Sequence, residues 1–100
     1  MHYFICYDIS NNGLRTRLYK KLLAKGCDPV QKSILLAADF APKEIKELKT
    51  IVKEIMDGSK APQDSVMVIP VSKEHYDKID LFNSSAGYQK VRQEKKSKFF

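Results

Sequence analysis

Several features that mark other classes of protein are absent from this chain of 100 residues. It has no long apolar run, and its mean hydropathy is −0.40, which together exclude a transmembrane helix. No basic segment followed by a long apolar stretch stands at its start, so we expect no cleaved secretion signal. Its two cysteines form no CxxC pair, which excludes a disulfide framework or a zinc cluster. We expect Cys6 and Cys27 to be reduced thiols in the core of a cytoplasmic protein, with a single bridge between them as the alternative.

The motifs of several enzyme classes are absent as well. The sequence contains no Walker loop, no GxGxxG and no serine or cysteine nucleophile elbow. The spacing of His2 and His75 does not make them a metal-binding pair. Tyr3, Phe4 and Tyr7 share one apolar segment, as aromatic residues do on the base-stacking strands of RNA recognition motifs, but the K/R-G-F/Y-G/A-F signature is missing. Core packing explains these aromatic residues better, and an RNA-binding ferredoxin-like module is a distant alternative.

The sequence has an excess of positive charge, with 18 lysines and arginines against 12 acidic residues and a net charge of +6. This balance, with a pI of 9.3, favours nucleic acid or another polyanion as the partner. Two segments, 10–27 and 88–100, hold five cations each, with no acid in the first and Glu94 alone in the second. Either segment alone is typical of a solvated helix face or a charged tail, whereas the two together favour phosphate binding. The cations of the first segment are Arg15, Arg17, Lys20, Lys21 and Lys25.

The hydrophobic pattern predicts one domain over residues 1–82, followed by a basic C-terminal tail over residues 83–100. The first helix is expected after a cap at Ser10, Asn11 or Asn12 and ends at Gly26. The second helix begins at Pro42 and is closed by Gly58. Strands are expected over 2–9, 29–36, 38–41 and 64–71, with a reversal at 37–39 and a helical turn within 73–82.

This order of elements, β-α-β-β-α-β, is that of the ferredoxin-like fold, an α+β class with an antiparallel sheet and both helices on one face. We expect the first and last strands in the middle of that sheet. Both are apolar on both of their faces, whereas a strand buried on one side alternates with polar residues. Because the helices bury only one face, we expect a second copy to cover the other and to form a homodimer packed sheet to sheet.

Asp8 is the most informative single residue, because it interrupts the apolar first strand where the chain turns into the basic helix. The simpler interpretation is a turn or helix-capping carboxylate. The functional interpretation is an oxygen ligand for Mg²⁺ beside a helix N-terminus that holds a phosphate. Dimer symmetry would supply a second Asp8, and two carboxylates sharing one ion can activate water for phosphodiester hydrolysis.

A second candidate group lies in residues 30–34. Alternation along the expected strand puts Gln31 and Ser33 on one side and Lys32 on the other. Such polar residues usually form an outward or edge face. Gln31 and Ser33 can also hydrogen-bond a phosphate, a sugar or each other across an interface, and they are therefore candidate nucleic-acid contacts.

These motifs, in this order, resemble those of a known family. They are Tyr7-Asp8-Ile9 after an apolar strand, an arginine at position 15 or 17, Gly26, Val30-Gln31-x-Ser33-Ile34, and Asp64-Ser65-Val66 at the last strand. Over roughly residues 1–80, the combination resembles the small CRISPR-associated nucleases of the adaptation module, the Cas-two family. Two departures from the family pattern are Pro29 in place of a basic residue and Leu35 in place of an aromatic one.

The resemblance implies a homodimer of ferredoxin-like subunits, often with an exchanged C-terminal strand, that cuts RNA or DNA with a bound metal. It also implies a partnership with the CRISPR integrase during spacer capture. The metal aspartate of the family falls on Asp8, its helix arginine on Arg15 or Arg17, and its strand serine on Ser33. One hypothesis is therefore a Mg²⁺-dependent phosphodiesterase centred on Asp8. The alternative is a non-catalytic architectural dimer that holds duplex DNA through the cations of residues 10–27.

Overall fold

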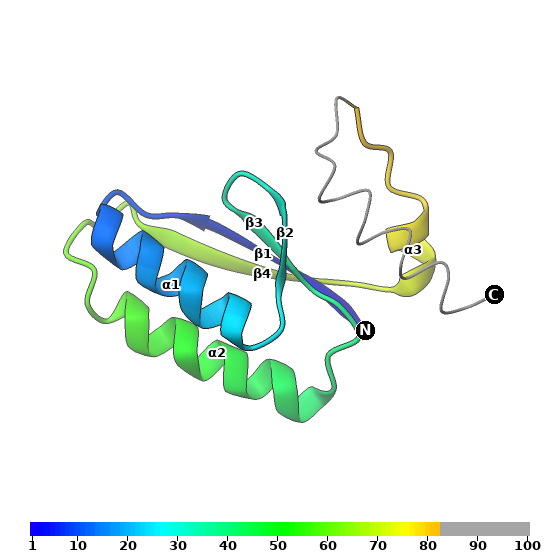
Figure 1. Ribbon diagram of the computed structural model, residues 1–100, viewed down its shortest axis with the longest axis horizontal. Coiled ribbons are helices and arrows are strands. Elements are labelled where there is room, and N and C mark those ends of the chain that lie inside the picture. Colours follow the sequence, from blue (N-terminus) through cyan, green and yellow to red (C-terminus); the bar gives the residue numbers. More distant parts are fainter. Residues whose placement is uncertain (83–100) are drawn as a thin grey trace.

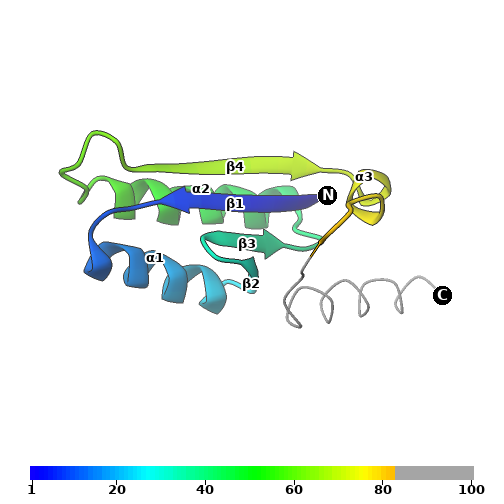
Figure 2. The same ribbon diagram turned by 90° about the horizontal axis from the view of Figure 1, so that it is seen from above.

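The structure is a computed structural model, and it describes residues 1–82 of the chain. The basic tail expected over residues 83–100 lies outside these described residues. Two helices run side by side along one face of a four-stranded antiparallel sheet, which confirms the ferredoxin-like α+β class (Figures 1 and 2). The elements in chain order are β1 (His2–Asp8), α1 (Asn12–Ala24), β2 (Asp28–Gln31), β3 (Ile34–Ala37), α2 (Pro42–Met56), β4 (Ser65–Val71) and α3 (Lys73–Asp77).

The strand order across the sheet is β2-β3-β1-β4, so β1 and β3 are central and β2 and β4 are edges. The prediction that the first and last strands are both central is therefore wrong for β4. Each helix connects two parallel strands that are two positions apart in the sheet. The strand between them is β3 for the connection from β1 to β2, and β1 for the connection from β3 to β4. Within the described sheet, β4 pairs with β1 alone, from His2↔Val71 to Asp8↔Ser65.

The hairpin between β2 and β3 turns at Lys32 and Ser33, so the single strand expected over 29–36 is in fact two strands. Ser33 takes a left-handed conformation with φ 64°, and Gln31 pairs with Ile34 across the turn. This turn was not predicted, because Lys32 and Ser33 stand where a two-residue hairpin usually has glycine or asparagine. The chain also turns at Asp39, where φ is 56°, but residues 38–41 lead directly into α2 and form no strand.

The helix ends follow the sequence signals. The Asn11 side chain accepts a hydrogen bond from the Leu14 N–H at 2.8 Å, which caps the first turn of α1. Gly26 follows the last turn with φ 101°, a conformation that a side chain would strain. At the start of α2, Pro42 occupies the first turn, and the Glu44 carboxylate accepts the Ala41 N–H at 2.9 Å.

The main core lies between the two helices and the inner face of the sheet. Its largest fully buried side chains are Ile5, Leu18, Leu22, Leu35 and Leu48. Cys27 belongs to this core, whereas Cys6 lies on the opposite face of β1, and both are free thiols. The prediction of a core position is thus confirmed for Cys27 and wrong for Cys6, and the alternative of a bridge between them does not hold.

The outer face of the sheet is covered at one end by the chain itself. Tyr76 of α3 is fully buried there against Val30 and Leu36, and Ile79 and Leu81 pack on the same cluster. The expectation that a second copy covers this whole face is therefore corrected for this end. The residues after β4 supply the cover, because α3 folds back over the start of β1.

The other end of the outer face is left open by residues 1–82. Met67 is 58% exposed and Ile69 is 39% exposed, and the register of β1 with β4 places Met67 beside Cys6. A second copy packed on this end stays a prediction. No helix in residues 1–82 is both long enough and apolar enough to span a membrane.

Candidate nucleic-acid site at the end of β1

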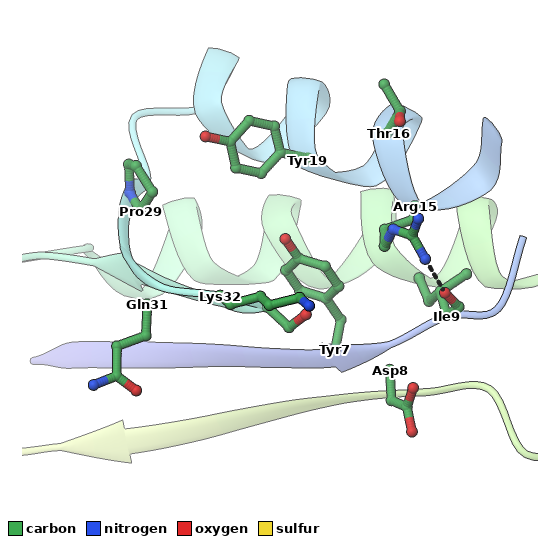
Figure 3. Close-up of a pocket in the computed structure, with 10 residues that line it drawn as sticks. Tyr7, Asp8, Ile9, Arg15, Thr16, Tyr19, Pro29, Gln31 and Lys32 are labelled. Atoms are coloured by element: carbon green, nitrogen blue, oxygen red, sulfur yellow. Dashed lines mark hydrogen bonds between the residues drawn. The ribbon is translucent and has the colours of Figure 1, made fainter. Parts of the chain in front are cut away.

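Asp8 is the last residue of β1, and its side chain is exposed on the open end of the outer face. Figure 3 shows Asp8 and Tyr7 pointing to opposite sides of β1, as consecutive strand residues do. Asn11 caps α1, so Asp8 is not the helix cap. Within residues 1–82 the Asp8 carboxylate makes no hydrogen bond or ion pair, and it is therefore available to an external ligand.

This carboxylate fits one part of a Mg²⁺ site. Mg²⁺ prefers hard oxygen ligands and is commonly held by one or two carboxylates, with water and substrate phosphate in the other positions. In the described part of the chain, no cluster of three or more His, Cys, Asp or Glu side chains is arranged to hold a metal. Asp8 can thus serve as one ligand, and a single subunit does not provide a complete cage.

A notch of about 590 Å³ opens beside the end of β1. It exists because the pairing of β1 with β3 stops early: the Tyr7 N–H donates to the Ser33 carbonyl at 3.0 Å, and the hairpin then turns away. Asp8 consequently has a paired neighbour only on the β4 side within the described sheet. The notch is lined by Tyr7, Asp8 and Ile9 of β1 and the segment after it, Arg15, Thr16 and Tyr19 of α1, and Pro29, Gln31, Lys32 and Ser33 of the hairpin (Figure 3).

Arg15 holds one wall of the notch in place. Its Nη1 donates to the Ile9 carbonyl at 3.0 Å, the interaction drawn as a dashed line in Figure 3, and its Nη2 donates to the Asn12 side chain. The guanidinium therefore takes the place of the absent strand partner at Ile9. Since an arginine has five N–H donors, others remain for a phosphate.

The structure brings Asp8, Arg15, Gln31 and Ser33 together at the notch. Gln31 and Ser33 do not share a strand face as expected, because Ser33 lies in the turn. The remaining cations of residues 10–27 lie elsewhere. Arg17, Lys20 and Lys21 line a separate depression of about 400 Å³ on the outward face of α1, and Lys25 forms an ion pair with Glu47 at 2.9 Å.

Asp64 is a residue that sequence reasoning placed in a motif without assigning it a role. Its carboxylate accepts hydrogen bonds from the Ser10 N–H at 3.0 Å, the Ser10 hydroxyl at 3.1 Å and the Ser59 hydroxyl at 2.7 Å. The bond from the Ser10 backbone and those from the two hydroxyls hold the pKa of Asp64 below its usual 3.8. Asp64 thus ties the segment after Asp8 to the start of β4.

Tyr7, Tyr19 and Lys32 were not predicted as site residues, and all three line the notch. Tyr7 was assigned to the core from its place in an apolar strand. Burial raises the pKa of the Tyr7 hydroxyl, and the neighbouring Tyr19 raises it further while Arg15 opposes the shift. No sequence signal links the three residues, because they come from three separate elements.

Comparison with known proteins identifies the family. A family model described as "CRISPR associated protein Cas2" matches residues 1–79, which include Asp8, Asp64 and every residue of the notch. The chain is also 40% identical over 86 residues to the "CRISPR-associated endoribonuclease Cas2 1" of Francisella tularensis subsp. novicida (strain U112). That alignment covers 86% of this chain and 79% of the relative. The chain therefore belongs to the CRISPR-associated Cas2 family, as the resemblance in its motifs predicted.

Proposed function

We propose that this protein is a CRISPR adaptation nuclease that hydrolyses phosphodiester bonds of RNA or DNA with Mg²⁺ held at Asp8. The observation that carries the proposal is the exposed Asp8 carboxylate, which has no partner within residues 1–82 and borders a notch lined by cations and hydroxyl groups. The relative named an endoribonuclease supports RNA as a substrate. The net charge of +6 suits any polyanionic substrate.

A homodimer would complete the site. The open end of the outer face carries Met67, Ile69 and Cys6 next to Asp8, and a second copy using the same patch forms an isologous contact. Each large apolar side chain that becomes fully buried contributes about 1.5–3 kcal/mol before the costs of association. Since Asp8 borders the patch, the symmetric contact brings a second Asp8 to the same region and doubles the number of carboxylate ligands.

The residues of the chain then have separate roles in hydrolysis. Asp8 binds the ion through its carboxylate oxygens, and Lys32 balances phosphate charge from the hairpin turn. Arg15 keeps the end of β1 in place through the Ile9 carbonyl. Mg²⁺ bound at Asp8 would lower the pKa of a water ligand and offset the charge that develops on the phosphate.

Replacement of one carboxylate tests the nuclease proposal. Asp8→Asn keeps the size of the side chain and removes its charge, and we expect Mg²⁺-dependent cleavage of labelled RNA and DNA to fall at least about 100-fold, since metal-ligand loss removes the main charge stabilisation. Asp57→Asn, at an exposed position after α2, is the matched control and should cut like the parent. Equal cleavage by Asp8→Asn and the control would refute the nuclease proposal.

An architectural role in an integrase complex is the second candidate function. It is supported by the outward face of α1, where Arg17, Lys20 and Lys21 are exposed together. A duplex bound there releases counterions, so the affinity should fall with salt with a log–log slope of about −0.9 for each phosphate contacted. Replacing all three cations with Gln should flatten the slope for duplex DNA by about 2–3. An unchanged slope would show that α1 does not contact the DNA. Under this architectural role we also expect Asp8→Asn to bind the duplex as tightly as the parent does.

A further inference from the structure

The notch has a composition that the hydrolysis of a phosphate does not require. Two half-buried tyrosines, Tyr7 of β1 and Tyr19 of α1, line it from neighbouring elements. Figure 3 shows both rings on the helix side of β1, away from Asp8. Neither hydroxyl hydrogen-bonds another residue in the described part of the chain, so both are available to water or to a ligand.

We infer that the notch binds one unstacked nucleotide of a single-stranded RNA, with the base against Tyr19 and Tyr7 and the phosphate beside Lys32. The volume of about 590 Å³ falls within the range of small-molecule sites. Proteins that read single-stranded RNA commonly stack splayed bases on aromatic side chains and hydrogen-bond the base edges. The tyrosine hydroxyls and that of Ser33, which also lines the notch, offer both donors and acceptors for such contacts.

The inference rests on the proposed function only for the position of the next phosphate. Tyr7 and Asp8 are consecutive and point to opposite sides of β1, at the point where β1 has lost its β3 neighbour. An RNA strand with one base in the notch can therefore cross the free edge of β1 and bring an adjacent phosphate to Asp8. A duplex cannot use the notch in this way, because its bases are stacked and paired.

Binding measured without divalent metal tests the notch independently of cleavage. The protein is titrated into a short fluorescent single-stranded RNA, and separately into a DNA duplex, in EDTA. Tyr19→Leu removes the ring, and we expect it to weaken RNA binding about 5- to 100-fold, the effect of losing one aromatic stacking partner. Tyr19→Phe keeps the ring and should stay within about threefold of the parent, and duplex affinity should change less than twofold in both variants.

Two further variants complete the test: one is a control for effects on folding, and the other tests the phosphate contact. Leu23→Ala changes an exposed α1 residue outside the notch and should bind RNA like the parent. Lys32→Gln lies in an exposed turn, so it leaves the core untouched. It should reduce the salt slope for single-stranded RNA by about 0.7, the contribution of one phosphate contact.

Several results would overturn the inference. They are parental RNA affinity in Tyr19→Leu, equal losses for RNA and duplex, equal losses in the Leu and Phe variants, or an unchanged salt slope in Lys32→Gln. The two proposals also fail separately. Ring-dependent RNA binding combined with normal cleavage by Asp8→Asn would retain the notch and refute the metal site, whereas the reverse pattern would retain the metal site and refute the notch.

Discussion

The two faces of the sheet have similar compositions and very different environments. On the inner face, Ile5 and Leu35 are at most 1% exposed beneath the helices. On the outer face, Met67 and Ile69 of β4 remain 58% and 39% exposed. An apolar pattern on both sides of a strand therefore indicates that both faces need cover, and it does not say which part of which chain provides the cover.

The outer face itself is divided into two ends. At the start of β1, Phe4 packs in the cluster around the fully buried Tyr76 of α3. At the end of β1, Cys6 and Asp8 lie beside the exposed Met67 and Ser65 of β4. Residues 1–82 thus cover the end around Tyr76 and leave open the end that carries the exposed Asp8 carboxylate.

The largest contrast between the faces is expected in subunit stability. Leu48→Ala removes a fully buried inner side chain and should lower the free energy of unfolding by about 2–5 kcal/mol. Met67→Ala on the outer face should change it by less than about 0.5 kcal/mol when dilute protein is unfolded in urea. Similar losses for the two variants would mean that the outer face is already covered within one subunit.

The next contrast concerns association. Met67→Asp places a charge in the patch expected to face a second copy, where it would be buried without a partner. We expect the dissociation constant of the homodimer to rise at least about 100-fold, with little change in the unfolding of dilute protein. Sedimentation velocity across a concentration series measures the effect, and Lys53→Asp on the exposed side of α2 is the charge control. A dimer unaffected by Met67→Asp would place the interface elsewhere.

The two cysteines report on the two faces without any substitution. Burial, with a smaller contribution from Asp28, raises the pKa of Cys27 to about 12, so very little thiolate exists at pH 8. Burial also raises the pKa of Cys6, but this thiol lies on the open outer face. In protein dilute enough to be monomeric, so that no second copy covers Cys6, iodoacetamide at pH 8 should therefore modify Cys6 at least about 100-fold faster than Cys27, as followed by mass spectrometry. Equal rates would show that the inner core opens as readily as the outer face.

The smallest effect is expected at Asp64, which anchors the segment leading from Asp8. Its folded-state pKa lies below the usual 3.8, so the unfolded state binds more protons in the acid range. The stabilising effect is complete above the unfolded pKa and is lost as the pH falls toward the folded one. Thermal unfolding midpoints of the parent should drop more between about pH 5 and pH 3 than those of Asp64→Asn. Parallel pH profiles would show that the hydrogen bonds to Asp64 do not contribute to stability.

Much of the fold could be predicted because its signals are local. Asn11, Gly26 and Pro42 act within one turn of their helix ends, where a cap or a backbone conformation depends on few neighbours. The turn at Lys32 and Ser33 escaped prediction because nothing in its composition marks it, and the left-handed Ser33 is held by the pairing of β2 with β3. The edge position of β4 escaped for a similar reason, because strand order depends on contacts between distant segments.

The residues of the candidate site likewise fall into those with a local sequence signal and those without one. Asp8 stands out in the sequence, since a carboxylate is unusual in an apolar strand and its position in an ordered set of motifs matched a family. The notch could not be foreseen, because Tyr7, Tyr19 and Lys32 belong to three elements that meet only after folding. The same holds for Asp64, whose partner Ser10 lies 54 residues away.

The order of strands and helices, the excess of positive charge and the acidic residue at the end of the first strand can all be read from the amino-acid sequence. These properties depend on periodicity, composition and short-range backbone preferences, which act within a few residues. Three further properties become visible only in the folded molecule: which strand is an edge, which half of the outer face residues 1–82 cover, and which side chains line the notch together with Asp8. These three properties depend on packing between segments that are far apart in the chain, and a pattern within a few residues does not predict them.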